Sequence, residues 1–104
     1  MDKFLLLFYG GSETPPDQAD QIDNAWMAWF KGMGKMVVDQ GNPTMSGKTV
    51  GPRGGVKSGV PGEAVTGYTI ISANDMDAAV MAAKSSPHLK AGGQIAVYSI
   101  VPWM

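Results

Sequence analysis

The sequence predicts an α+β fold, a ferredoxin-like sandwich of the order βαβ-(β)-βαβ. Residues 66–101 read as a strand, a capped helix, a Pro/Gly break and a second strand. Residues 3–40 follow the same order, so each half of the chain is one strand–helix–strand unit. The chain has 104 residues, the usual size of one domain, and we therefore expect a single domain over 1–104.

The first predicted strand, Lys3–Tyr9, is apolar on both of its faces. Side chains alternate along a strand, which sets Phe4, Leu6 and Phe8 against Leu5, Leu7 and Tyr9. A strand with two apolar faces must be covered on both of them. Because the helices of so short a chain cover one face only, we expect a homodimer, with two sheets packed around a shared, barrel-like interior.

The first helix is expected after a turn at Ser12–Pro16 and should end near Gly32 and Gly34. Aspartates fill its first turns, where the helix dipole favours negative charge: Asp17, Asp20 and Asp23. Apolar side chains at helical spacing form one stripe: Ile22, Trp26, Trp29, Phe30 and Met33. We interpret this aromatic stripe as the core-facing side of the helix, and the alternative is a wall of a ligand pocket.

The middle of the chain reads as a short strand followed by a long loop. Met36–Gln40 is the second strand, in which Asp39 is either exposed at a sheet edge or functional. Seven of the 22 residues of 41–62 are Gly and three are Pro, with one strand candidate at Lys48–Val50. A loop of this length is either the lid of a pocket or a flexible, turn-rich hairpin, and both interpretations stay open.

The second half begins with a strand at Val65–Ser72, rich in β-branched residues. Asn74 is the expected N-cap of the following helix, and Pro87 is expected to stop it. That helix carries a flat inward stripe of Met76, Ala79, Val80 and Ala83. The last strand, Gln94–Val101, is again largely apolar on both faces, and it leads into an apolar tail at Trp103 and Met104.

Composition and motifs argue against several classes of function. The net charge is −1 with no basic run, so we expect no nucleic-acid partner. The chain has no Cys and one His, so we expect no metal site. The stretch Asn42–Thr49 resembles a phosphate-binding loop but has Asn where the first Gly is required, and we expect no cofactor. No apolar run is long enough for a membrane span, so we expect a cytoplasmic protein.

Four polar residues are candidates for a ligand site: His88, Asp39, Asn42 and Lys48. His88 follows Pro87 at an expected helix end, where an imidazole can bind free carbonyls and where the dipole favours a cation. We favour this capping role for His88, and a ligand-binding or acid–base role is the alternative. Tyr9, Tyr68 and Tyr98 are each expected to be packed, although any of them could point its hydroxyl into a cavity.

The chain resembles the YCII-related (DGPF-type) family. The resemblance lies in Gly67-Tyr68, Ile71, Ala73–Ala79, Ser86–Leu89, Gly92-Gly93, Ile95 and Val97, with Val38–Pro43 and Phe4–Leu7 also similar. It implies a dimeric α+β barrel. Some members are thought to use a His–Asp pair with the His on the first helix, and others occur beside sigma-factor proteins.

Two departures from the family pattern bear on activity. The first helix carries Trp26 and Trp29 and no His, and Lys57–Pro61 stands near where the Asp-Gly-Pro-Phe signature would be. Whether the protein is an enzyme therefore stays open. The sequence favours a dimer that binds a small molecule in the cavity between the sheets. The alternative is a non-catalytic interaction module accessory to transcriptional regulation.

Overall fold

The computed structural model describes residues 1–11 and 19–102. The expected turn at Ser12–Pro16, Asp17 at the helix start and the tail at Trp103 and Met104 lie outside these residues. The elements are, in order, β1 (Asp2–Tyr9), α1 (Ala19–Met33), η2 (Gly34–Met36), β2 (Val37–Asp39), β3 (Lys48–Val50), β4 (Val56–Ser58), β5 (Val65–Ala73), α2 (Met76–Lys84), α3 (Pro87–Lys90) and β6 (Gln94–Ser99).

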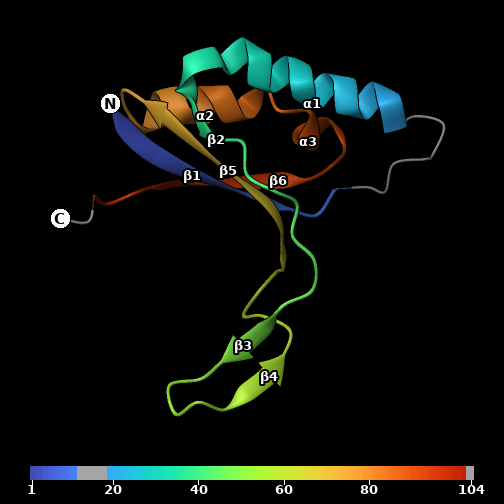
Figure 1. Cartoon of the computed structure of the whole chain (residues 1–104), viewed down its shortest axis with the longest axis vertical. Coiled ribbons are helices and arrows are strands. Elements are labelled where there is room, and N and C mark those ends of the chain that lie inside the picture. The colour runs from blue at the N-terminus through green and yellow to red at the C-terminus, as the bar shows by residue number, and fades with distance from the viewer. Residues whose placement is uncertain (12–18, 103–104) are drawn as a thin grey trace.

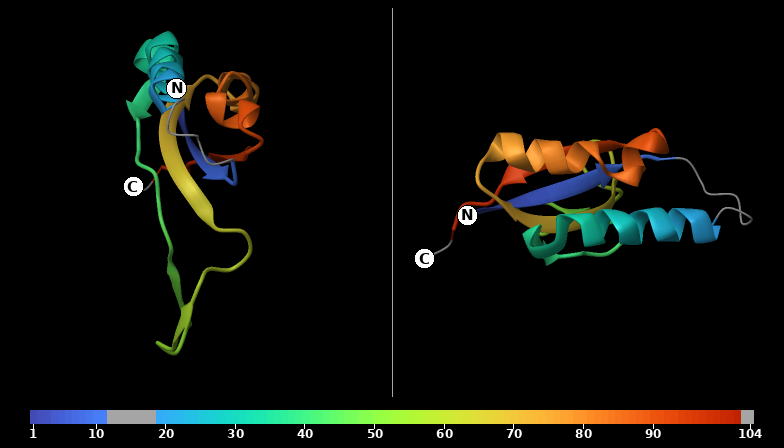
Figure 2. Two further views of the ribbon diagram at one scale, coloured as in Figure 1. Left: turned by 90° about the vertical axis from the view of Figure 1, so that its right-hand side faces the viewer. Right: turned by 90° about the horizontal axis from the view of Figure 1, so that it is seen from above.

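The main sheet has four strands in the order β2-β5-β1-β6, and each neighbouring pair is antiparallel. The strands of the two strand–helix–strand units therefore alternate, because β5 lies between β1 and β2 while β1 lies between β5 and β6. Helices α1 and α2 lie side by side over one face of this sheet (Figures 1 and 2). The predicted α+β class and the repeated order of elements are confirmed.

The core lies between the two helices and the sheet. It contains Phe4, Leu6, Phe8, Trp29, Ile71, Ala73, Ala79 and Ala83. The predicted alternation along β1 is confirmed, because Phe4, Leu6 and Phe8 are buried while Leu5 and Leu7 on the opposite face are only half-buried. Ala79 and Ala83 of α2 are both buried, and their small side chains let that helix lie close to the sheet.

The indole of Trp29 ties α1 to the end of α2. Its Nε1–H donates to the carbonyl of Ala82 at 3.0 Å and to Ser85 Oγ at 3.2 Å. The side chain is 7% exposed, so these bonds are shielded from competing water. These two hydrogen bonds fix α1 relative to α2, and they thereby position the other aromatic residues of α1 over the sheet.

A second, two-stranded sheet forms from β3 and β4, with Val50 opposite Val56. The predicted strand at Lys48–Val50 is confirmed, but its partner Val56–Ser58 was not predicted. The sequence signal for β4 was weak, because the strand has only three residues and directly follows the Gly54-Gly55 turn. The hairpin extends away from the helices, beyond the opposite face of the main sheet (Figures 1 and 2). Of the two interpretations of this segment, the turn-rich hairpin describes its shape.

Two details of the second helical region differ from the prediction. The N-cap of α2 is Asp75 and not Asn74, because the Asp75 carboxylate accepts the Ala78 N–H at 2.8 Å. Helix α2 ends at Lys84, before Pro87, which instead opens the short helix α3. Proline suits a first helical position, where the missing N–H has no helical acceptor to lose. Among the described residues, no helix is long and apolar enough to cross a membrane.

We predict that replacing Trp29 with Phe lowers the free energy of unfolding by about 1–3 kcal/mol, because the buried hydrogen bonds to Ala82 and Ser85 are lost. Chemical denaturation followed by circular dichroism measures this change. Met27→Leu on the same helix is the control, since Met27 is 69% exposed, and it should stay within about 0.5 kcal/mol of the wild type. Equal stability of Trp29→Phe and wild type would contradict the anchoring role.

Candidate functional site

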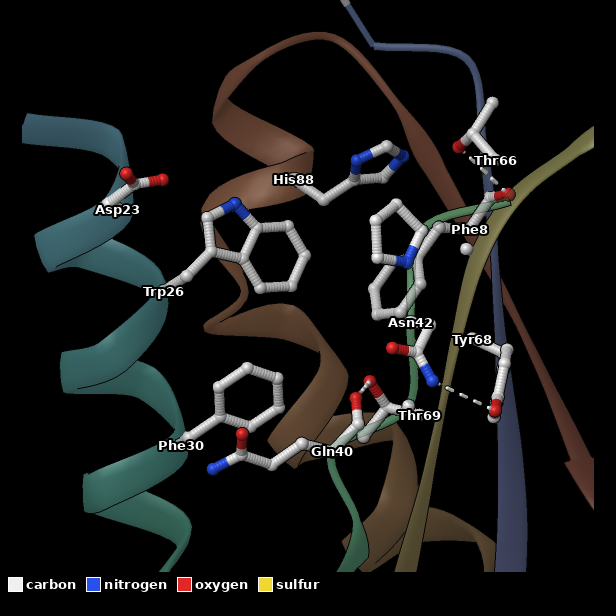
Figure 3. Close-up of a pocket in the computed structure, with 13 residues that line it drawn as sticks. Phe8, Asp23, Trp26, Phe30, Gln40, Asn42, Thr66, Tyr68, Thr69 and His88 are labelled. Atoms are coloured by element: carbon white, nitrogen blue, oxygen red, sulfur yellow. Dashed lines mark hydrogen bonds between the residues drawn. The ribbon is translucent and has the colours of Figure 1, made fainter. Parts of the chain in front are cut away.

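A cavity of about 390 Å³ lies on the helix side of the main sheet, between α1, α3 and the chain that follows β2 (Figure 3). It is lined by Phe8, Asp23, Trp26, Phe30, Gln40, Gly41, Asn42, Pro43, Thr66, Gly67, Tyr68, Thr69 and His88. These residues come from both halves of the chain, so the site forms only when the whole domain folds.

Aromatic rings form the apolar wall of this cavity. The rings of Phe8 and Trp26 meet edge to face at 5.3 Å and 76°, and those of Trp26 and Phe30 lie 6.0 Å apart at 36°. The aromatic stripe of α1 thus serves both as the core-facing side of the helix and as a wall of the cavity, the two roles considered from the sequence. Trp29 belongs to the core, while Trp26 and Phe30 pack against the core and also line the cavity.

The imidazole of His88 closes one side of the cavity. Its Nε2 lies 2.9 Å from the carbonyl oxygen of Tyr9, at the end of β1. A carbonyl can only accept, so Nε2 carries the proton, and in the neutral ring Nδ1 is an acceptor. The prediction that His88 caps the preceding helix is wrong. Because Pro87 starts a new helix after α2 has ended, the ring reaches back to the first strand instead.

Two glycines leave room for this ring. A Cβ at Gly93 would overlap His88 Nε2, and one at Gly11 would lie 3.1 Å from its Cε1. The backbone of Gly93 has no positive φ, so this position is glycine because of the imidazole and not because of the turn. In the sequence, Gly92-Gly93 indicated only a turn, and nothing there linked it to His88.

Polar groups around the cavity are partly paired. Thr66 Oγ1 donates to the Phe8 carbonyl at 3.1 Å, and Thr69 Oγ1 donates to the Gln40 carbonyl at 2.9 Å. The Asn42 amide donates to the Tyr68 hydroxyl at 3.4 Å, which leaves its Oδ1 as an acceptor. Within the part of the chain that the structure describes, the Asp23 carboxylate has no hydrogen-bond or ion-pair partner.

The four candidates from the sequence are not all brought together. His88 and Asn42 line the cavity. Asp39 ends β2 outside the lining, where its carboxylate accepts the Gly41 N–H at 2.8 Å and shapes the turn that leads to Asn42. Lys48 lies on the projecting hairpin and takes no part in the lining.

Several lining residues were not predicted as site residues. Asp23 was interpreted only through its favourable position at the start of a helix, and Gln40 and Thr66 carried no signal in the sequence. Gly41 has a backbone signal, since its φ is +75° and a Cβ there would overlap the Tyr68 carbonyl. That close approach holds the chain after β2 against β5, beside the cavity.

No three His, Asp or Glu side chains gather around a common point in residues 1–11 and 19–102. Comparison with protein-family models and with curated proteins found no match to this chain. The resemblance to the YCII-related family therefore stays a prediction.

We predict that Gly93→Ala displaces the His88 ring and breaks its bond to Tyr9, at a cost of about 0.5–1.5 kcal/mol in stability. Nitrogen-15 NMR of the imidazole should show the loss of a protonated, hydrogen-bonded Nε2. Gly55→Ala is the matched control, because a Cβ there meets nothing within 4 Å and its φ is not positive. An unchanged His88 spectrum in Gly93→Ala would refute this account of the ring's position.

Proposed function

We propose that this protein is a small-molecule-binding homodimer whose ligand occupies the cavity between α1, α3 and the sheet. The observation that carries the proposal is a cavity of about 390 Å³ with aromatic walls and a few polar groups. Ligand pockets typically measure about 300–1,000 Å³ and combine apolar walls with a small number of polar groups. The proposed ligand site lies on the helix side of the sheet, whereas the sequence had favoured a site in the cavity between the sheets of two copies.

The proposal concerns binding rather than a particular reaction. Ser85 and Ser86 stand beside His88 in the sequence, yet Ser85 Oγ donates to the Ala82 carbonyl at 2.9 Å. Ser86 Oγ accepts the backbone N–H of His88 at 3.2 Å. Neither hydroxyl is bonded to the imidazole, so these residues do not form a nucleophile–base pair. His88 is therefore proposed as a ligand-orienting acceptor.

We propose a ferredoxin-like fold that pairs into a dimeric α+β barrel. The strand order β2-β5-β1-β6, with its two interleaved strand–helix–strand units, supports the fold. Support for pairing comes from the sheet face opposite the helices. On that face Leu5 stands between Ile70 and Tyr98, and Leu7 between Tyr68 and Ala96.

The centre of this outer face is apolar, and helices α1 and α2 lie on the other face of the sheet (Figures 1 and 2). Tyr98 at its edge is 53% exposed. The hairpin of β3 and β4 extends on the same side (Figure 1), so a second copy placed there would be flanked by it. Burial of this face against its symmetric copy would remove apolar surface from water, which is the main favourable term in association.

The alternative, a non-catalytic interaction module, is favoured by the hairpin itself. Val50 and Val56 face each other there and are 69% and 60% exposed. The segment 41–62 carries Lys48, Arg53 and Lys57 and no acidic residue. An exposed apolar pair with cations around it fits an acidic protein surface. If the protein is monomeric and its cavity binds nothing, this alternative gains support.

We predict that a thermal-shift screen of small molecules finds compounds that stabilise the protein. At about 10 times Kd, mass action adds about 1.4 kcal/mol, which raises Tm by several degrees. The shift should disappear in Trp26→Leu, which removes part of the cavity wall. It should persist in Met27→Leu, whose side chain is exposed and outside the cavity. Equal shifts in both variants would place the ligand elsewhere.

We predict that sedimentation at micromolar concentration finds a dimer and that Leu5→Lys converts it to a folded monomer. A lysine at Leu5 would put a charge at the centre of the apolar sheet face, where it has no partner. Met27→Lys adds the same charge on exposed α1 and should leave the dimer intact. Circular dichroism confirms that both variants are folded. A monomeric wild type would exclude the dimer.

A further inference from the structure

We infer that the ligand of this cavity is a small organic cation, an amine or quaternary ammonium compound. The inference rests on the proposed function, because it assigns a chemical class to the ligand of that same site. It is carried by three features of the lining: its charge, the arrangement of its aromatic rings, and the acceptor atoms of His88 and Asn42.

The charge of the lining favours a cation. Among the described residues, those that line the cavity include one carboxylate, that of Asp23, and no Lys or Arg. An anionic ligand would lose its hydration without meeting a cation in the lining, which is costly. A positive ligand meets the Asp23 carboxylate, which the described residues leave without an ion-pair partner.

The aromatic rings form a corner suited to a positive charge. Trp26 projects from α1 toward His88 and Phe8, with Phe30 one turn further along the helix (Figure 3). Because Phe8 meets Trp26 at 76°, a ligand in the corner contacts the face of at least one ring. A cation within about 6 Å of a ring centroid is attracted by the negative face of the ring, and Trp binds most strongly.

Two further polar groups of the lining offer acceptor atoms. The Nε2–H of His88 is engaged by Tyr9, so Nδ1 offers a lone pair, and among the described residues nothing donates to it. The amide of Asn42 donates to Tyr68, which leaves its Oδ1. A protonated amine has only donors, so it can satisfy these acceptors and the Asp23 carboxylate together. Choline has no N–H, but its hydroxyl can donate to one of these acceptors while its charge lies near the carboxylate.

The test uses choline and its neutral isostere 3,3-dimethylbutan-1-ol as probes on the chain of 104 residues. Binding is followed by the ¹H–¹⁵N resonance of the Trp26 indole, assigned by its absence in Trp26→Leu. We expect choline to bind at least about fivefold more tightly than the alcohol. In Asp23→Asn the affinity for choline should fall by about twofold to fivefold, while that for the alcohol stays unchanged. Asp20→Asn is the control, because Asp20 lies on the same helix outside the lining.

The possible outcomes distinguish failure of the cation preference from failure of the proposed ligand site. Equal affinities for the two probes, or tighter binding of the alcohol, would leave a ligand site but overturn its preference for cations. If neither probe shifts the Trp26 resonance, the cation inference fails. The proposed ligand site fails as well only if no compound from the thermal-shift screen moves that resonance.

Discussion

The hydrogen bond from His88 to Tyr9 joins the C-terminal half of the chain to the first strand, and the candidate site depends on it. It fixes the tautomer of the imidazole and turns the ring toward Phe8, at a centroid distance of 5.2 Å. Gly93 and Gly11 supply the space that this position requires. Without this bond, only packing against Phe8 and Trp26 would hold the ring at this wall of the cavity.

A second set of contacts fixes the opposite wall. Trp29 is buried and bonded to the end of α2, so the neighbouring Trp26 is carried on a helix that cannot slide over the sheet. The aromatic stripe of α1 therefore has two functions that follow from geometry. One side of the stripe fills the core, and the adjacent side lines the cavity. The helix could not shape the cavity if it were not also held by the core.

Much of the fold could be predicted from the sequence because it rests on local periodicity. The alternation along β1, the apolar spacing of α1 and the small residues of α2 each specify an element and its buried side. The errors lie where the outcome depends on one hydrogen bond. Asp75 rather than Asn74 caps α2, and Pro87 opens a helix rather than ending one. Strand β4 is three residues long and gave almost no periodic signal.

The site was harder to predict because its residues meet only in the folded chain. His88 and Asn42 were singled out as polar groups expected next to an apolar interior, and both line the cavity. Lys48 was chosen on the same grounds but lies on the hairpin. The helix dipole already explains an aspartate at position 23 near the start of a helix, so the sequence offered no reason to place Asp23 in a cavity lining. Such residues are recognisable only once the topology has placed β5 and α3 beside α1.

The claim on which the rest depends is that a ligand binds on the helix side of the sheet. A crystal structure of the protein with the tightest compound from a thermal-shift screen tests it most directly. We expect ligand density between Trp26 and His88, within the cavity that Asp23 and Asn42 also line. Density between the sheets of two copies, with the Trp26 cavity unchanged, would contradict it.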